Sequence, residues 1–294
     1  MKKRPLALLL LPVVIIGLIL IQRALTKKVY TYNSKAVYVY NLTDDKKVLA
    51  ENENEKLPMA SLTKMMTVLV GLEKTSDLNA LAPIDTESYL EMVNENASMA
   101  GFYGGEQTTF RDLFYGAMLP SGGEAACSIA TNISGSKLSF VELMNEKAKE
   151  LELTNTHFQN PDGMDDLGHY SSAKDMAMLL KNALQNENYR AIFTRKDYTS
   201  SPTADHPDGV YMESTVFKKL YQYKEDGFEI IGGKSGTTEK AGLCWATLSE
   251  KNGKEYIIVV MGAPYEDIDN PEDGQIQDTC LLYTSDAADD TPCV

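Results

Sequence analysis

Residues 58–70 read PMASLTKMMTVLV and place a serine and a lysine on one face of a predicted helix. Ser61 stands where this helix is expected to begin, and Lys64 follows one turn later. Lys64 is the only charged residue between Ser61 and Leu72, and an apolar surface nearly all round is typical of a buried helix. A buried ammonium is unfavourable unless it is paired or neutral. A lysine pushed toward neutrality beside a hydroxyl can activate a serine as a nucleophile without histidine.

The Ser-x-x-Lys spacing alone is a weak signal, because it recurs at residues 134–137 and 171–174. The copy at 171–174 crosses a helix start that Ser172 and Asp175 are expected to cap, so its lysine lies on a polar face. The copy at 134–137 lies in a predicted loop, where no buried helix surrounds the lysine. Other stretches must therefore decide whether Ser61 is catalytic.

The composition excludes some classes of function. The chain has 294 residues, of which 43% are hydrophobic, enough for one large domain or two small ones. Its formal net charge of −14 disfavours nucleic acid as a partner, because phosphate binding needs basic patches. Cys127 and Cys244 lie in apolar neighbourhoods without zinc-ligand spacing. We expect both to be buried free thiols.

The amino-terminal segment predicts export. The apolar run at residues 6–21 (LALLLLPVVIIGLILI) follows Lys2, Lys3 and Arg4. No small-x-small cleavage site precedes Arg23, which favours an uncleaved signal anchor over a removed signal peptide. We therefore expect residues 1–28 to form a cytoplasmic tip and anchor, with the rest of the chain outside the membrane. Cleavage of the segment would make the protein secreted.

The carboxyl-terminal segment resembles a translated transposase adapter from DNA library preparation. Back-translation of residues 280–285 (CLLYTS) as TGT CTC TTA TAC ACA TCT reproduces the adapter core. We predict that residues 280–294 are not native, the alternative being an ordinary flexible tail. The predicted catalytic domain is then residues 29–279, truncated at its carboxyl-terminal end.

The pattern of strands predicts an antiparallel sheet. Residues 36–41 and 47–50 form an expected opening hairpin, and three further strands are expected at 228–236, 242–248 and 255–261. Asn252-Gly253 is a strong hairpin turn signal. Strands at both ends of the sequence with helices between them predict an α/β protein of the α+β type, in which the first and last strands meet in one sheet covered by helices.

Several helices have predicted starts. Thr109 should cap a helix through Met118, and a second helix is expected at 125–133. Ser139-x-x-Glu142 reads as a capping box for the helix that follows. Ser172 should cap another helix that ends near residue 186.

Three short motifs occur along the chain in a characteristic order and spacing. Ser61-Leu62-Thr63-Lys64, Ser121-Gly122-Gly123 and Lys234-Ser235-Gly236 follow the order and rough spacing of the penicillin-binding motifs S-x-x-K, S-x-N and K-[ST]-G. With the flanking stretches 160–163 (NPDG) and 169–172 (HYSS), residues 35 to 265 resemble the low-molecular-mass D-alanyl-D-alanine carboxypeptidases, the S11 serine peptidases. The resemblance implies a serine β-lactamase/penicillin-binding-protein transpeptidase-like fold, with an antiparallel sheet flanked by helices and a helical subdomain.

The resemblance also implies a set of roles. Ser61 would attack the carbonyl between two D-alanines to form an acyl-enzyme, with Lys64 as the base. The pKa of Lys64 would be lowered by burial and by Lys234. Ser121 would relay a proton to the leaving amine.

Further implied roles concern substrate binding. Lys234 and Ser235 would hold the substrate carboxylate, and Gly232, Gly233 and Gly236 would let the substrate backbone approach the strand. The main-chain N–H groups of Ser61 and Thr237 would form the oxyanion hole. The family uses no cofactor or metal. The implied partners are peptidoglycan stem peptides, β-lactams as covalent inhibitors and, through the anchor, a bacterial membrane.

Gly123 departs from the family pattern, which usually has asparagine there. The expected substrate contact at Gly123 would then be missing, and either Glu124 or a water replaces it, or activity is reduced. Two alternatives stay open. A β-lactamase is one, although no Glu-x-x-x-Asn loop of the class A kind is present. A catalytically weak penicillin-binding scaffold is the other, motivated by Gly123.

Overall fold

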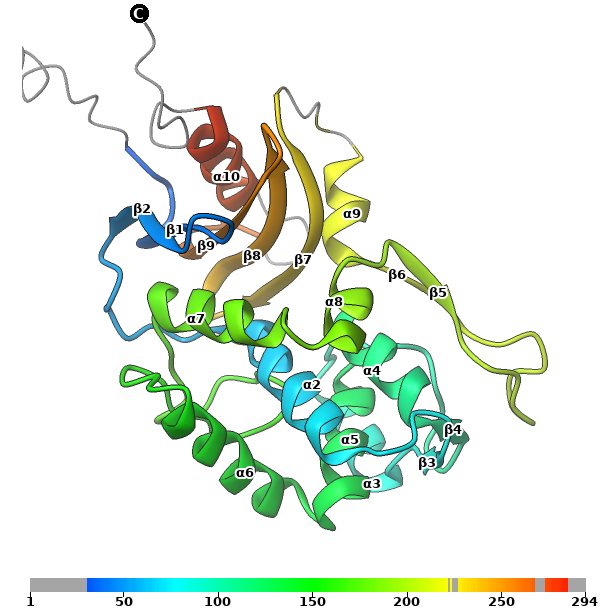
Figure 1. Ribbon diagram of the computed structural model, residues 1–294. Coiled ribbons are helices and arrows are strands. Elements are labelled where there is room, and N and C mark those ends of the chain that lie inside the picture. The colour runs from blue at the N-terminus through cyan, green and yellow to red at the C-terminus, as the bar shows by residue number, and fades with distance from the viewer. Residues whose placement is uncertain (1–30, 222, 224–226, 268–272, 285–294) are drawn as a thin grey trace, which may run out of the picture. The chain divides into compact units, whose positions relative to one another are not determined.

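Strands far apart in the sequence lie side by side in one sheet (Figure 1). The structure is a computed structural model that describes residues 31–221, 223, 227–267 and 273–284. Five antiparallel strands follow the order β2-β1-β9-β8-β7. They are β1 (Ala36–Asn41), β2 (Lys46–Glu51), β7 (Glu229–Thr238), β8 (Gly242–Lys251) and β9 (Lys254–Ala263). Tyr38 of β1 pairs with Val259 of β9, which confirms the predicted sheet.

The turn between β8 and β9 is the predicted Asn252-Gly253 hairpin. Both residues have positive φ, 53° and 72°, as a two-residue turn of this kind requires. Lys251 therefore pairs directly with Lys254. The tight turn sets the register that places alternate residues of β9 on opposite faces.

The sheet is buried on both faces. Ile257 and Val259 of β9 join the main hydrophobic core, whereas Ile258 and Val260, on the alternate face, are buried outside it. On the core face, α7 (Ala173–Ala183) packs against β1 and β9. On the other face, α10 (Gly274–Thr284) packs against β9 and β8. A strand buried on both sides is continuously apolar, which is why β9 reads EYIIVVM.

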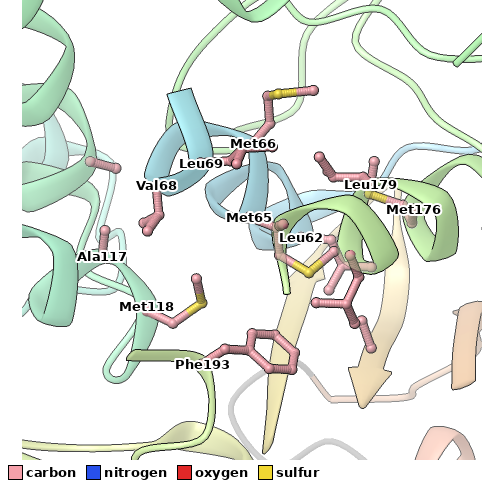
Figure 2. Packing of buried hydrophobic residues seen from close by; sticks show 14 of the residues in the cluster. Leu62, Met65, Met66, Val68, Leu69, Ala117, Met118, Met176, Leu179 and Phe193 are labelled. Carbon is pink, nitrogen blue, oxygen red and sulfur yellow. The ribbon is translucent and has the colours of Figure 1, made fainter. Parts of the chain in front are cut away.

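The helix predicted from residues 58–70 runs through the centre of the molecule. It is α2 (Thr63–Lys74), and every residue from Thr63 to Leu72 is buried. Its side chains Met65 and Met66 lie among residues of the neighbouring helices (Figure 2). The surrounding elements include α4 (Phe110–Met118), α5 (Gly123–Ser134), α6 (Lys137–Glu150) and α8 (Glu187–Phe193). The absence of a polar face is therefore explained by packing on all sides.

Smaller elements complete the described chain. They are η1 (Ala60–Leu62), α3 (Thr86–Asn94), α9 (Thr215–Leu220) and two short hairpins, β3 (Leu81–Pro83) with β4 (Gln107–Thr109) and β5 (Asp197–Thr199) with β6 (Tyr211–Glu213). Of these, η1 and α9 both pack against β7, the edge strand of the sheet.

The helix starts confirm two predicted caps and correct a third. Thr109 forms a capping box with Asp112, and Ser172 caps α7. The predicted capping box at Ser139 is wrong, because α6 begins earlier and Ser136 caps it. The Ser136 hydroxyl accepts the Ser139 N–H at 3.1 Å, so Ser139 lies inside the first turn. Gly135, with φ 78°, ends α5 and lets the chain reverse one residue before that cap.

The predictions for the two ends of the chain concern mostly residues that the structure does not describe. Residues 1–28, including the apolar run, lie outside them, and so do residues 285–294. The predicted boundary after Thr279 falls inside α10, where Leu282 is buried. The foreign origin of residues 280–294 stays a prediction. Within the ranges that the structure covers, no helix has the length and apolarity needed to cross a membrane.

Candidate active site

Ser61 lies just before α2, in the single 3-10 turn η1. Ser61 was expected where the helix begins, whereas α2 begins two residues later, at Thr63. The Ser61 side chain caps neither η1 nor α2. Lys64 Nζ donates to Ser61 Oγ at 3.0 Å, as the predicted spacing on one face requires. A lysine this close to a hydroxyl can take its proton once the amine is neutral.

Lys64 lies in an environment that favours the neutral amine. Its side chain is buried among the residues of α2 and its neighbours, and burial lowers the pKa of Lys64, while the charge of Asp162 opposes the shift. Lys64 Nζ also donates to the main-chain oxygen of Asp162 at 2.5 Å. This second contact orients the amine toward Ser61 without supplying a full counter-charge.

The turn at residues 160–163 holds Lys64 from the side. Thr67 of α2 donates to the Pro161 main-chain oxygen at 2.6 Å, one residue before the oxygen that binds Lys64. The Asp162 carboxylate accepts the Met164 N–H at 2.8 Å, which fixes the turn internally. The Asn-Pro-Asp-Gly stretch is therefore part of the site because its backbone docks on α2.

A second amine and hydroxyl lie together nearby. Lys234 Nζ of β7 donates to Ser121 Oγ at 2.8 Å and to the Ser235 main-chain oxygen at 2.7 Å. Lys234 is fully buried, and burial together with the charge of Lys64 holds the pKa of Lys234 well below its usual value. Repulsion between two protonated amines is mutual, so protonation of either lysine disfavours protonation of the other. Ser121 has φ 68°, so the turn before α5 is strained where it presents its hydroxyl.

The edge of β7 touches the turn that carries Ser61. A Cβ added at Gly236 would lie 2.8 Å from Ser61 N and 3.0 Å from Ala60 Cβ, so only glycine fits there. Next to it, Ser235 Oγ lies 2.7 Å from Thr215 Oγ1 of α9. Ser61 and Lys234 are thus brought to one place by direct contact between η1 and β7.

The sequence of this chain matches a family of known peptidases. A family model described as D-alanyl-D-alanine carboxypeptidase, Peptidase S11, matches residues 23–265. The chain belongs to the S11 peptidase family. D-alanyl-D-alanine carboxypeptidase DacF of Bacillus subtilis is 32% identical over 241 residues, which cover 79% of this chain and 58% of the relative. DacC of Escherichia coli is 34% identical over 232 residues, which cover 74% of this chain and 54% of the relative.

The fold of this S11 peptidase is shared with solved structures. A crystal structure of a Streptomyces DD-transpeptidase matches with a TM-score of 0.74 and 26% identity, covering 87% of this chain and 96% of that one. These findings confirm the predicted family and the transpeptidase-like fold. The chain spans about half the length of the two curated carboxypeptidases named above.

The glycines of β7 in this S11 peptidase have a different role from the predicted one. A Cβ at Gly232 would lie 2.9 Å from Phe193, and one at Gly233 would lie 2.9 Å from Val216. Packing against α8 and α9 therefore explains both glycines, rather than access of the substrate backbone to the strand. Gly236, which contacts the Ser61 turn, is the one of the three that bears directly on the site.

Gly123 of the second motif is placed by the structure against α3. Its N–H donates to the Ser98 main-chain oxygen at 2.7 Å, and an added Cβ would lie 2.5 Å from Met92 Sδ. Gly123 does not have a positive φ, whereas Ser121, two residues earlier, does. Glu124, the proposed replacement for asparagine, accepts the Ala100 N–H at 2.6 Å and so binds the neighbouring loop.

We expect a side chain at Gly123 to destabilise the protein and not to speed acylation. Gly123→Ala should lower the free energy of unfolding by about 1–3 kcal/mol, because the new methyl group collides with buried Met92. Gly123→Asn should do at least as much damage. Urea unfolding of Gly123→Ala, Met92→Ala and the double variant measures the coupling between the two sites.

The double variant should be more stable than the sum of the single changes predicts, since the shortened residue 92 leaves room for the methyl group. Strict additivity would show that Met92 does not fill this space. Faster acylation by Gly123→Asn would restore the interpretation of Gly123 as a missing substrate contact.

Some residues of the site were not predicted from sequence. The Asp162 main-chain oxygen and Thr215 contribute a carbonyl and a hydroxyl, groups that nearly every sequence window contains. His169 entered the sequence analysis only as part of the flanking stretch 169–172, yet its ring lies 2.7 Å from Thr63 Oγ1, two residues after Ser61. Within the described residues, no cluster of three or more His, Cys, Asp or Glu could hold a metal ion. Cys127 and Cys244 are buried free thiols, as predicted.

Proposed function

We propose that this S11 peptidase is a serine D-alanyl-D-alanine carboxypeptidase that removes the terminal D-alanine from peptidoglycan stem peptides. The observation that carries the proposal is the pair of amine–hydroxyl contacts, Lys64 with Ser61 and Lys234 with Ser121, joined where β7 meets η1. Family membership and the names of the relatives support the same activity.

In the acylation step, neutral Lys64 takes the proton of Ser61 as its oxygen attacks the carbonyl between the two D-alanines. The N–H groups of Ser61 and Thr237 stabilise the negative oxygen that forms. The C–N bond then breaks, and the proton that Lys64 took from Ser61 passes through Ser121 to the leaving amine, which leaves Lys64 neutral. An ester on Ser61 and free D-alanine result.

In the deacylation step, water attacks this ester, and the amine of Lys64 takes the proton of the water. Ser61 regains its proton when the C–O bond breaks, and the shortened peptide leaves as a carboxylate. The same base serves both steps, so the cycle returns the site to its starting state.

The substrate carboxylate binds Lys234, Ser235 and the adjoining main chain at Gly236 and Thr237. A desolvated Lys234 gains from this pairing, because the incoming carboxylate favours the protonated amine. The requirement for a fixed cation restricts cleavage to the free end of a peptide, and Gly123 takes no part in this binding.

The pH profile of turnover follows from the two lowered lysine pKa values. Activity needs neutral Lys64, so kcat/KM should rise with pH through a pKa below the usual lysine value of 10.5. It also needs protonated Lys234, whose pKa is held well below its usual value by burial and by the charge of Lys64, so kcat/KM should fall as pH rises through that pKa. The rising and falling limbs should therefore overlap and leave a narrow maximum. In kcat the falling limb should move to higher pH, because bound carboxylate raises the pKa of Lys234.

This profile is measured by release of D-alanine from a diacyl-L-lysyl-D-alanyl-D-alanine peptide. A rate that is flat from about pH 6 to pH 10 would argue against Lys64 as the base.

A fluorescent penicillin followed over time tests the function against its alternatives. Label that persists on Ser61, together with release of D-alanine from the peptide, supports the carboxypeptidase. Rapid loss of label with hydrolysed penicillin would indicate a β-lactamase. The absence of both label and peptide cleavage would indicate a scaffold that only holds stem peptides.

The structural similarity to a DD-transpeptidase favours a second test. An amino acceptor such as glycylglycine competes with water for the acyl-enzyme. Formation of the peptide-linked product in preference to hydrolysis would assign transpeptidation as the main activity of the same acyl-enzyme.

We propose that the protein acts on the extracytoplasmic face of a bacterial membrane. The basic residues 2–4 followed by the apolar run at 6–21 support an anchored amino terminus, and the peptidoglycan substrate lies outside the membrane. Membrane fractionation with and without residues 1–28 tests this. Release of the intact protein into the medium would indicate a cleaved signal instead.

A further inference from the structure

A buried histidine lies behind the peptide group that carries the nucleophile. His169 Nε2 lies 2.7 Å from Thr63 Oγ1, and both residues are buried. Thr63 Oγ1 in turn donates to the Ala60 main-chain oxygen at 2.8 Å, and the Thr63 N–H donates to the same oxygen. One carbonyl thus receives two donors from one residue, and the histidine contacts that residue from the far side.

The hydrogen bonds at the two ring nitrogens assign the tautomer of His169. The Gln159 N–H donates to His169 Nδ1 at 2.9 Å, so Nδ1 carries no proton. In the neutral ring the proton is then on Nε2, which donates to Thr63 Oγ1. The Thr63 hydroxyl must therefore use its own proton on Ala60. Burial lowers the pKa of His169 to about 4, which keeps the ring neutral at physiological pH.

The Ala60 oxygen belongs to the same peptide group as the Ser61 N–H. A peptide group is planar and trans, so its C=O and N–H point in opposite directions. Holding the oxygen toward Thr63 therefore turns the Ser61 N–H toward the other side, where Gly236 of β7 lies against Ser61 N. Ala60 has φ 49°, a conformation that an alanine rarely keeps unless its surroundings hold it.

The 160–163 turn packs closely against the Ala60 oxygen. A Cβ at Gly163 would lie 2.2 Å from the Ala60 oxygen, so the 160–163 turn lies directly against that oxygen. Gly163 has φ 90° and donates its N–H to Asn160, which keeps its own position fixed. The peptide is thus confined by packing on one side and held by hydrogen bonds on the other.

We propose that His169 is a positioning residue that, through Thr63, orients the Ala60–Ser61 peptide so that the Ser61 N–H faces the substrate carbonyl. The proposal rests on the proposed acyl-transfer function. His169 touches neither substrate nor Ser61 Oγ, and its effect is on the oxyanion hole rather than on proton transfer. A merely structural alternative exists, in which His169 only ties the main chain at Gln159 to α2.

Two matched variants separate these roles, because each keeps one end of the ring. In His169→Gln the side-chain amide reaches the position of Nε2 and still donates to Thr63, but the acceptor for Gln159 is lost. In His169→Asn the shorter amide oxygen stands near Nδ1 and still accepts from Gln159, but the donor to Thr63 is lost. The measurements are the acylation rate constant with penicillin and the kcat and KM for a D-alanyl-D-alanine peptide.

We expect His169→Asn to lower acylation and kcat by about 10-fold to 100-fold, with KM nearly unchanged, because a misplaced donor weakens only the transition state. His169→Gln should stay within about threefold of the wild-type rate, since its amide still reaches Thr63. Affinity for a boronic acid analogue, which forms a tetrahedral adduct on Ser61, should fall in parallel with kcat.

Thr63 supplies an independent pair of variants should the histidine variants fail to fold. Thr63→Val removes the hydroxyl at nearly constant volume and should lower acylation as His169→Asn does, whereas Thr63→Ser should retain the rate. Combining Thr63→Val with His169→Asn should cost little more than either alone, because both break one chain of contacts.

Labelling of the wild-type protein distinguishes failure of the positioning role from failure of the proposed function. If the wild-type protein reacts with penicillin and His169→Asn and Thr63→Val react equally fast, the positioning role is overturned and the proposed function stands. A loss confined to His169→Gln would assign the structural role. If the wild-type protein neither reacts with penicillin nor cleaves the peptide, the function and the inference both fail.

Discussion

Replacing Ser61 with alanine is expected to abolish penicillin labelling and peptide cleavage, with a loss of about a thousandfold or more. In the proposed function the acyl-enzyme forms on Ser61 Oγ, and no other hydroxyl lies within hydrogen-bond distance of Lys64 Nζ among the described residues. Since Ser61 caps neither η1 nor α2, the free energy of unfolding should change by less than about 0.5 kcal/mol. Mass spectrometry after incubation with penicillin measures the adduct directly.

Ser134→Ala is the matched control, because Ser134 belongs to a second Ser-x-x-Lys copy. Its hydroxyl donates to the Ala130 main-chain oxygen at the end of α5, and Lys137 of the same copy pairs with Glu91. Labelling should therefore be unaffected. Adduct formation on Ser61→Ala at the wild-type rate would remove Ser61 as the nucleophile.

Lys64→Met is expected to lower the acylation rate by about 100-fold to 10,000-fold, the usual contribution of a general base. Methionine has a similar length and suits the buried site, but it can neither accept the Ser61 proton nor donate to Asp162. The loss of one donor to a buried carbonyl is offset by removal of a desolvated amine, so the fold should survive. Stopped-flow acylation and thermal unfolding measure the two effects separately.

The residual activity of Lys64→Met should also lose the rising limb of the pH profile, because no other buried amine contacts Ser61 within the described residues. Lys137→Met serves as the control and should leave the rate unchanged, since Lys137 is paired with Glu91 away from Ser61. Acylation of Lys64→Met within about threefold of the wild-type rate would exclude Lys64 as the base.

The elements predicted most accurately are those whose local pattern and environment agree. The apolar stretch that became α2 is buried on every side, and the turn at Asn252-Gly253 has the backbone that its residues favour. The cap of α6 was misassigned because Ser136 and Ser139 are three residues apart, and either could begin the helix. The choice was made by Gly135, whose positive φ places Ser136 at the start.

The contact of Ser61 with Lys64 could be predicted because the two residues are three positions apart in the sequence. The roles of Gly232 and Gly233 could not, because the side chains that need their space come from α8 and α9. The packing of Gly123 could not be predicted for the same reason, since Met92 lies on a different helix. The contact of Lys64 with the Asp162 oxygen leaves no trace in side-chain types, because every residue has that oxygen.

The pairing of β1 with β9 has a consequence for the order of folding. Tyr38 pairs with Val259, and in the described sheet β9 is the strand that joins β8 and β7 to β1 and β2. The sheet therefore cannot close until nearly all of the described chain is available, and such a high contact order predicts slow folding. During this interval the β1–β2 hairpin has an open edge, which is a site for unwanted pairing between molecules. That edge stays open until β9, near the end of the described residues, has been made.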